Sequence, residues 1–131
     1  MGIFDTSYPY PAESADRLHI AGYDHEDGSV VAPEGELDIA SAPLLSGYFG
    51  RLAAGGRSRV VADFANLDFC DCAGLGVLLR AHRRYTAAGG WLRLCAARPS
   101  IQKTLHITRL AGVLVCYPNV AAAFLGMDAR Q

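Results

Sequence analysis

Hydrophobic runs long enough to cross a membrane are missing from this chain of 131 residues, as is the charged-then-apolar start of a secretory signal peptide. Basic residues are not in excess, since 12 lysines and arginines stand against 13 acidic residues, for a formal net charge of -1. A surface with that balance offers little attraction to nucleic acid. We therefore expect a cytoplasmic protein that binds neither membranes nor nucleic acid.

The CxxC spacing of redox and zinc motifs is also absent, and 51% of the chain is hydrophobic, so a core can form without disulfides. We expect the cysteines to be reduced thiols. Convergence on a zinc ion is the alternative, because two of them end predicted strands, but chance clustering of buried thiols is the simpler interpretation. Neither a metal site nor a cofactor is predicted. The cysteines are Cys70, Cys72, Cys95 and Cys116.

Catalytic pairings are lacking as well. A Cys–His pair would need an imidazole beside Cys72, but His82 lies ten residues further along the same predicted helix and so about 15 Å away. The stretch Gly74-Leu75-Gly76 lacks the third glycine of a dinucleotide-binding fingerprint. The sequence therefore favours neither of these catalytic or cofactor-binding sites, and we expect a protein that is not an enzyme.

Strand-like and helix-like segments alternate from Arg17 onward. Two strands, one around Leu18 and Ile20 and one over 29–37, flank a turn-rich stretch at 24–28 and predict a hairpin. The remaining segments are predicted as a helix from near Pro43 to Gly55-Gly56, strand 59–64, helix 73–88, strand 91–95, helix 99–108, strand 113–117 and helix 119–125.

This alternation predicts an α/β fold in a single domain, with a mostly parallel central sheet, an N-terminal hairpin and about four flanking helices. We assign residues 17–126 to that domain. Residues 1–16 show no sustained periodicity and are expected to form a mobile tail, and residues 127–131 a short C-terminal tail.

The segment from Val60 to Arg84 is the most informative. An apolar run typical of a strand covered on both faces leads through a short acidic loop into an amphipathic helix. Cys72 is predicted at or next to the N-cap of that helix, where unpaired backbone N–H groups and the helix dipole favour a negative charge. Such a position suits a phosphate or a thiolate.

Two motifs flank the starts of the first two predicted helices. Gly35-Glu36-Leu37-Asp38 precedes the first, and Phe69-Cys70-Asp71-Cys72-Ala73-Gly74-Leu75 leads into the second. They resemble the Gly-x-Leu-Asp and Phe-x-Asp-Ser-(Ser/Thr/Ala)-Gly-Leu motifs of the STAS domain, in particular of stand-alone bacterial anti-sigma-factor antagonists. The likeness extends from about Arg17 to Leu125 and implies the STAS fold. One departure matters most, because Cys72 replaces the family's phosphoacceptor serine.

The resemblance also implies a partner-binding surface around that position. Asp38 is explained equally well as a helix cap. For Asp71 a cap is the alternative, but its place in the motif, before a small residue and Gly-Leu, favours the partner surface. Gly74 is expected to permit close approach of the helix to its neighbour or to a partner backbone. The implied partner-binding residues are Asp38, Asp71, Cys72, Ala73, Gly74 and Leu75.

The activity that the resemblance implies is partner switching, in which the protein captures an anti-sigma factor, typically a small serine kinase with a GHKL ATPase fold, and frees a sigma factor for transcription. Because sulfur is larger than oxygen and its bond to carbon is longer, Cys72 is a poor phosphoacceptor, and the usual serine phosphorylation is expected to be absent. The alternative is a scaffold or sensor subunit that binds other STAS or signalling proteins or a small ligand, with Cys72 as a redox switch. Arg80, Arg83 and Arg84 form a helix face that is either solvated or a docking surface for an acidic partner.

Overall fold

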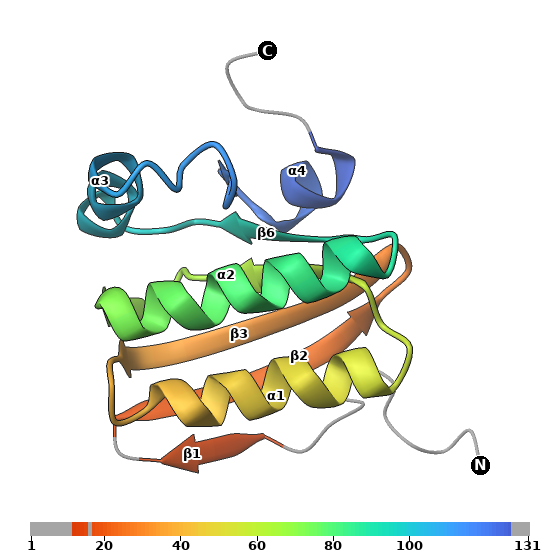
Figure 1. The fold of residues 1–131 in the computed structure, drawn as a ribbon, viewed down its shortest axis with the longest axis horizontal. Helices are drawn as coiled ribbons and strands as arrows, with labels where there is room; N and C mark the ends of the chain where they lie inside the picture. Colours follow the sequence, from red (N-terminus) through yellow and green to blue (C-terminus); the bar gives the residue numbers. More distant parts are fainter. Residues whose placement is uncertain (1–11, 16, 127–131) are drawn as a thin grey trace.

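The computed structural model describes residues 12–15 and 17–126, which form a sheet with helices packed on it (Figure 1). In the described part the strand order is β1-β2-β3-β4-β6-β7, and a seventh strand, β5, pairs with β3. The strands are β1 (Glu13–Ala15), β2 (Leu18–His25), β3 (Gly28–Leu37), β4 (Arg59–Asp63), β5 (Leu67–Cys70), β6 (Trp91–Cys95) and β7 (Cys116–Tyr117).

The pairing confirms the predicted α/β fold with an N-terminal hairpin and a mostly parallel sheet. β2 and β3 form the hairpin, with Asp24 opposite Ser29 and His25 opposite Gly28. β3 then pairs in parallel with β4 near its start and with β5 near its end, so these two short strands follow one another along one edge of β3. β4 and β6, and β6 and β7, are also parallel.

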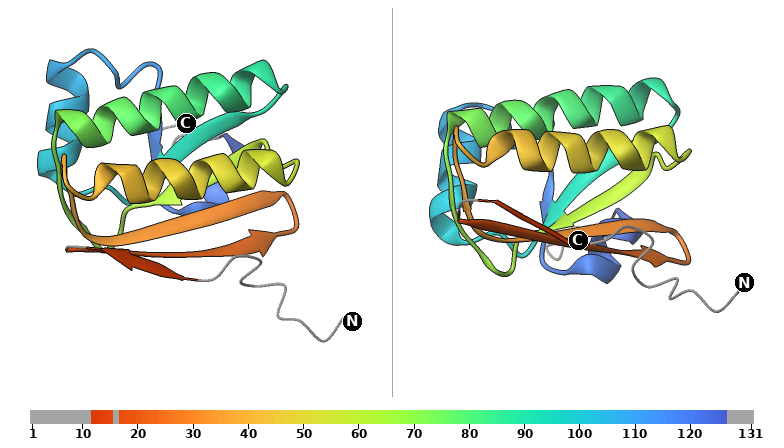
Figure 2. Two further views of the ribbon diagram at one scale, coloured as in Figure 1. Left: turned by 60° about the horizontal axis from the view of Figure 1, so that its bottom comes forward. Right: turned by 90° about the horizontal axis from the view of Figure 1, so that it is seen from below.

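The helices are α1 (Ala42–Ala54), α2 (Cys72–Ala87), α3 (Pro99–Ile107) and α4 (Val120–Leu125). α1 and α2 lie side by side on one face of the sheet and begin at the same end of it, and α4 lies under the opposite face (Figure 2). α3 lies at the carboxyl end of β6 (Figure 1). None of these helices is long and apolar enough to span a membrane.

The core forms because each long helix turns one apolar stripe toward the sheet. In α1 the buried residues Leu45, Tyr48 and Leu52 recur at spacings of three and four. The buried Tyr85 of α2 donates its hydroxyl hydrogen bond to the carbonyl oxygen of Phe49 at 2.8 Å, which satisfies a polar group that burial would otherwise penalise. The two helices are therefore fixed to the sheet and to each other.

The N-terminal part of the chain differs from the prediction of a tail over 1–16. Residues 1–11, 16 and the predicted C-terminal tail at 127–131 lie outside the described residues. Glu13–Ala15, however, form an edge strand against β2, and Glu13 pairs with Arg51 of α1. Tertiary contacts of this kind leave no periodic pattern in a segment of three residues.

Two further boundaries differ from the sequence prediction. Residues 67–70, predicted as part of an acidic loop, form β5, whose pairing with β3 includes a register shift between Gly35 and Glu36. The predicted strand 113–117 is reduced to β7, because the chain before it coils and Leu114 donates its N–H to the Leu110 carbonyl oxygen at 2.7 Å.

Candidate functional site

The two motif segments end at the same edge of the sheet. Leu37 at the end of β3 is in register with Cys70 at the end of β5, and the N–H of Asp71 donates to the Leu37 carbonyl oxygen at 3.1 Å. Asp38 and Asp71 therefore leave neighbouring parallel strands directly beside each other. Because loops at the carboxyl ends of parallel strands commonly carry function, this edge is the candidate site.

Asp71 is the N-cap of α2. Its backbone is extended, and its Oδ1 accepts a hydrogen bond from the N–H of Gly74 at 3.1 Å, the expected geometry for a capping carboxylate. Cys72 is therefore the first residue of the helix, and its side chain is exposed. Ala73 follows it and is half-buried. The structure thus presents a thiol to solvent at a helix N-terminus.

Asp38 folds back onto the turn before α1. Its Oδ1 accepts hydrogen bonds from the N–H groups of Ala40 and Ser41, each at 3.0 Å, and Ser41 also donates its hydroxyl hydrogen bond to the Glu36 carbonyl oxygen at 2.9 Å. The backbone hydrogen bond from Ser41 is the main reason that the pKa of Asp38 is lowered. Asp38 is therefore ionised at neutral pH and stabilises the turn.

Gly74 and Leu75 lie inside the protein. Leu75 is buried, and a Cβ at Gly74 would lie 2.7 Å from Cγ of Leu37 and 2.8 Å from Sγ of Cys70. The missing side chain of Gly74 thus lets α2 pack against the strand ends, which is one of the two roles the sequence suggested. Neither residue offers a side chain to a partner in this structure.

Exposed apolar side chains lie on the two segments that lead to α1 and α2. Ile39 is 79% exposed and Phe69 is 49% exposed. A hollow of about 450 Å³ opens between the starts of α1 and α2 and is lined by Ile39, Cys72 and Ala73 among others. Sequence reasoning missed this apolar surface, although an apolar residue within an acidic loop, as at Phe69, was a signal for it.

We define the carboxyl-edge surface as the exposed or half-buried residues at this end of the sheet. It combines two carboxylates, a thiol and two large apolar side chains, which suits protein contact better than small-molecule catalysis. Its residues are Asp38, Ile39, Phe69, Asp71, Cys72 and Ala73.

The other thiols are buried or half-buried and are not part of this surface. Burial raises the pKa of Cys70 to about 12, with the negative charge of Asp71 adding to the effect, and burial likewise raises the pKa of Cys95 to about 12. Burial also raises the pKa of Cys116. Among residues 12–15 and 17–126, no three His, Cys, Asp or Glu side chains gather so as to hold a metal ion. The described residues therefore give no support to the zinc alternative.

His82 has a structural role in α2. Its Nδ1 accepts a hydrogen bond from the N–H of Leu92 in β6 at 3.3 Å. The imidazole thus links the helix to the sheet, well along α2 from Cys72 at its start.

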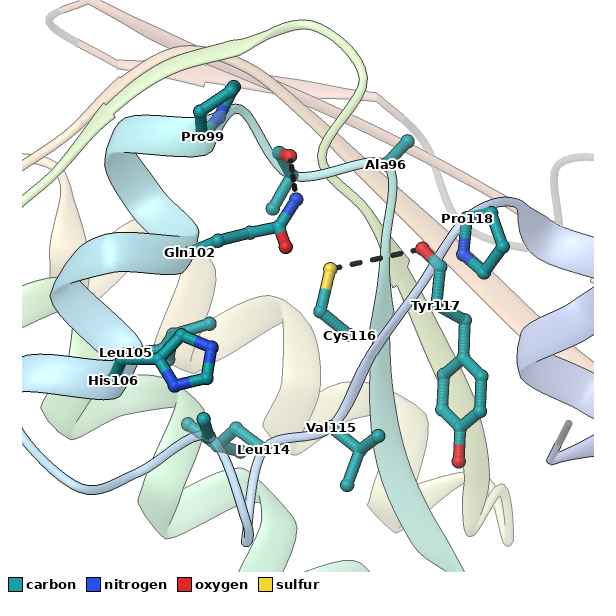
Figure 3. A pocket seen from close by; sticks show the side chains of 12 residues that line it. Ala96, Pro99, Gln102, Leu105, His106, Leu114, Val115, Cys116, Tyr117 and Pro118 are labelled. Carbon is teal, nitrogen blue, oxygen red and sulfur yellow. Dashed lines mark hydrogen bonds between the residues drawn. The ribbon is translucent and has the colours of Figure 1, made fainter. Parts of the chain in front are cut away.

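A second hollow, of about 690 Å³, lies between α3 and the segment leading into α4 (Figure 3). Gln102 from α3 and Cys116 from β7 point into it, and Gln102 donates a hydrogen bond from Nε2 to the Ala97 carbonyl oxygen at 2.8 Å. None of the residues predicted for the site lines this hollow, whereas most of them belong to the carboxyl-edge surface. We therefore take the carboxyl-edge surface as the candidate site.

One known protein family matches most of this chain. The family model of the STAS domain matches residues 19–123 of this chain. The chain belongs to the STAS domain family. Within it, the chain is similar to the anti-sigma F factor antagonist of Paenibacillus polymyxa, with 24% identity over 112 residues, 85% of this chain and 96% of that protein.

Two further STAS relatives carry related names. A candidate anti-sigma factor antagonist of Bordetella bronchiseptica, BtrV, is 30% identical over 96 residues, which cover 72% of this chain and 80% of that protein. The crystal structure of an anti-sigma factor antagonist from Mycobacterium paratuberculosis has a TM-score of 0.77 and 25% identity, covering 87% of this chain and 97% of that one. The family resemblance and the fold predicted from the sequence are thereby confirmed.

Proposed function

We propose that this STAS protein is an anti-sigma factor antagonist that captures an anti-sigma factor through the carboxyl-edge surface and so regulates transcription by a sigma factor. The observation that carries the proposal is the position of Cys72, which is exposed at the first residue of α2 beside two strand-end carboxylates. The names of the relatives support an anti-sigma factor as the partner. Binding requires no turnover, so the protein acts without being an enzyme.

The kind of partner is indicated by the residue that Cys72 replaces in the family motif. In the family motif the Cys72 position is the serine that a kinase-type anti-sigma factor phosphorylates. Asp71 caps the helix beside it, and Ile39 and Phe69 offer apolar contact area. We infer a GHKL-type kinase as partner, one that binds this surface but cannot use it as a substrate, because a thiol places a larger atom on a longer bond where in-line transfer needs a hydroxyl oxygen.

Incubation with purified kinase-type anti-sigma factors from the same genome tests this proposal. The wild-type chain should be retained by one of them in a pull-down and should remain unphosphorylated in the 71–74 loop when ATP is added. The Cys72→Ser variant should bind the same protein and gain a phosphate in that loop, mapped by mass spectrometry. Phosphate in this loop of the wild type would contradict the claim that Cys72 prevents phosphorylation by the kinase.

The same pull-down separates the scaffold or sensor alternative. Capture of other STAS proteins, and of no anti-sigma factor, would favour that role. Loss of binding upon mild peroxide treatment, restored by a reductant and absent in Cys72→Ala, would identify Cys72 as a redox switch.

A further inference from the structure

A groove runs between α1 and α2 away from the carboxyl-edge surface. The hollow of about 450 Å³ beside Cys72 and another of about 210 Å³ further along share Ser46, Val77 and Arg80 in their walls. Figure 2 shows the two helices lying side by side along their length. We call this continuous depression the interhelical groove, lined by Ser46 and Gly50 of α1 and by Gly76, Val77, Arg80 and Arg84 of α2.

Positive charge is concentrated on these two helices. α1 and α2 together contain four arginines and no acidic residue, in a chain whose formal net charge is -1. Arg51 pairs with Glu13. No described carboxylate lies within ion-pair distance of Arg80, Arg83 or Arg84. The positive charge along the groove is therefore not neutralised by the described part of the chain.

Two glycines lie next to two of these guanidinium groups in the groove. A Cβ at Gly76 would lie 3.3 Å from Nη1 of Arg80, and a Cβ at Gly50 on α1 would lie 3.5 Å from Nη1 of Arg84. The first contact would be tight and the second an ordinary van der Waals contact, so both guanidinium groups lie close to the helix backbone at these glycines. The two guanidinium groups are exposed and lie one helical turn apart along the groove.

The ends of the groove differ in character. Beside Cys72 it is apolar, with Ile39 and Val77 in its wall, and the carboxylates of Asp38 and Asp71 stand near that end. Toward Arg84 it is basic. A nucleic-acid backbone, which is evenly negative, would be repelled at one end, whereas a polypeptide can place an apolar side chain there and acidic side chains at the other.

We propose that the interhelical groove binds an acidic segment of a partner protein, with its carboxylates on Arg80 and Arg84 and an apolar side chain in the hollow beside Cys72. Resting on the proposed function, this segment belongs to the anti-sigma factor. The groove thus extends the carboxyl-edge surface and selects partners by charge as well as by contact with Cys72.

Charge reversal with a matched control tests the groove. Arg80→Glu/Arg84→Glu should weaken binding to the captured anti-sigma factor by about tenfold or more, while the control Arg83→Glu/Lys103→Glu, with the same change in net charge outside the groove, should change the affinity by less than about threefold. Dissociation constants are measured by calorimetry at two salt concentrations, and unfolding by urea verifies that both variants fold. Equal losses in the two variants would overturn the proposal.

A probe that does not depend on the anti-sigma factor keeps the two proposals distinct. A synthetic peptide with leucine at one end and glutamates four residues apart at the other is titrated into 15N-labelled protein. The amide and arginine side-chain signals should shift along α1 and α2, and these shifts should vanish in Arg80→Glu/Arg84→Glu but persist in the control. Absence of shifts in the wild type overturns the groove proposal, even where an anti-sigma factor binds. Peptide binding without any anti-sigma factor partner would leave the groove supported and the proposed function contradicted.

Discussion

At the scale of single residues, Gly74 and Gly76 differ sharply although they lie two positions apart in α2. An added methyl group at Gly74 would collide with Leu37 and Cys70, both held in strands, whereas at Gly76 it would meet only the flexible guanidinium of Arg80. We predict that Gly74→Ala lowers the free energy of unfolding by about 1 to 3 kcal/mol. Gly76→Ala should be neutral or stabilising by up to about 1 kcal/mol. Urea unfolding of both variants checks this, and equal stabilities would contradict the packing described here.

The buried thiols of Cys70 and Cys95 give the protein a pH dependence on the alkaline side. Their pKa values rise from an ordinary 9.0 to about 12 on folding, mainly through burial. Above pH 9 the unfolded chain loses these protons while the folded chain keeps them, so the stability is complete below about pH 9 and declines up to about pH 12.

We therefore predict that Cys70→Ala/Cys95→Ala has a flatter decline in unfolding free energy between pH 9 and 11 than the wild type. Each thiol contributes at most about 1.4 kcal/mol per pH unit to the difference. Urea titrations at several pH values provide the measurement. Parallel slopes would mean that the thiols are not buried as described.

At the site, the positions of some residues could be predicted from the sequence and those of others could not. Cys72 at the start of α2 and the capping geometry of Asp71 were predictable, because capping leaves a local pattern. Close approach of Gly74 to a neighbouring element was one of the predicted roles, but its neighbour Leu37 was not predictable, since β3 lies far from Gly74 in sequence. The exposure of Ile39 and Phe69 likewise depends on tertiary packing.

At the scale of elements, α2 connects the proposed binding surface to the core. Asp71, at the start of α2, contributes to the stability of the helix and to the charge of the surface. Its Oδ1 caps the helix, and its charge faces the proposed partner. Asp71→Ala should lower the free energy of unfolding by about 1 kcal/mol, while Asp71→Asn keeps a capping oxygen and should cost only a few tenths, about 0.3 kcal/mol. If the charge contributes to binding, Asp71→Asn should weaken capture without this loss of stability. Asn and Ala variants of equal stability would argue against the cap.

The helices and longer strands were predictable because their apolar periodicity runs over several turns or residues, as for 59–64 and 73–88 in the sequence. β5 was missed because Asp68 and Phe69 are both exposed between buried Leu67 and Cys70, which breaks the alternation of a strand. β7 was overestimated because Val113 and its neighbours are apolar but coil in turns.

At the scale of the whole molecule, the order of strands decides where the site lies. β4 and β5 follow one another along β3, and this brings Asp71 beside Asp38 from a point far along the chain. The alternation of elements predicted the fold class, but no local pattern encodes which strands become neighbours. The family resemblance implied only that Asp38 and Asp71 share one surface, and the structure places them on neighbouring strand ends.

Calorimetric titration with the captured anti-sigma factor tests the central claim, that Cys72 lies at the centre of the partner-binding surface. Cys72→Asp adds a charge at the first turn of α2, and Ala121→Asp adds the same charge at the exposed first turn of α4, which lies on the opposite face of the sheet. Because a fixed charge in a contact surface must be desolvated, we expect Cys72→Asp to weaken binding by about tenfold or more while Ala121→Asp binds like wild type. Wild-type affinity of Cys72→Asp, with the protein folded, would contradict it.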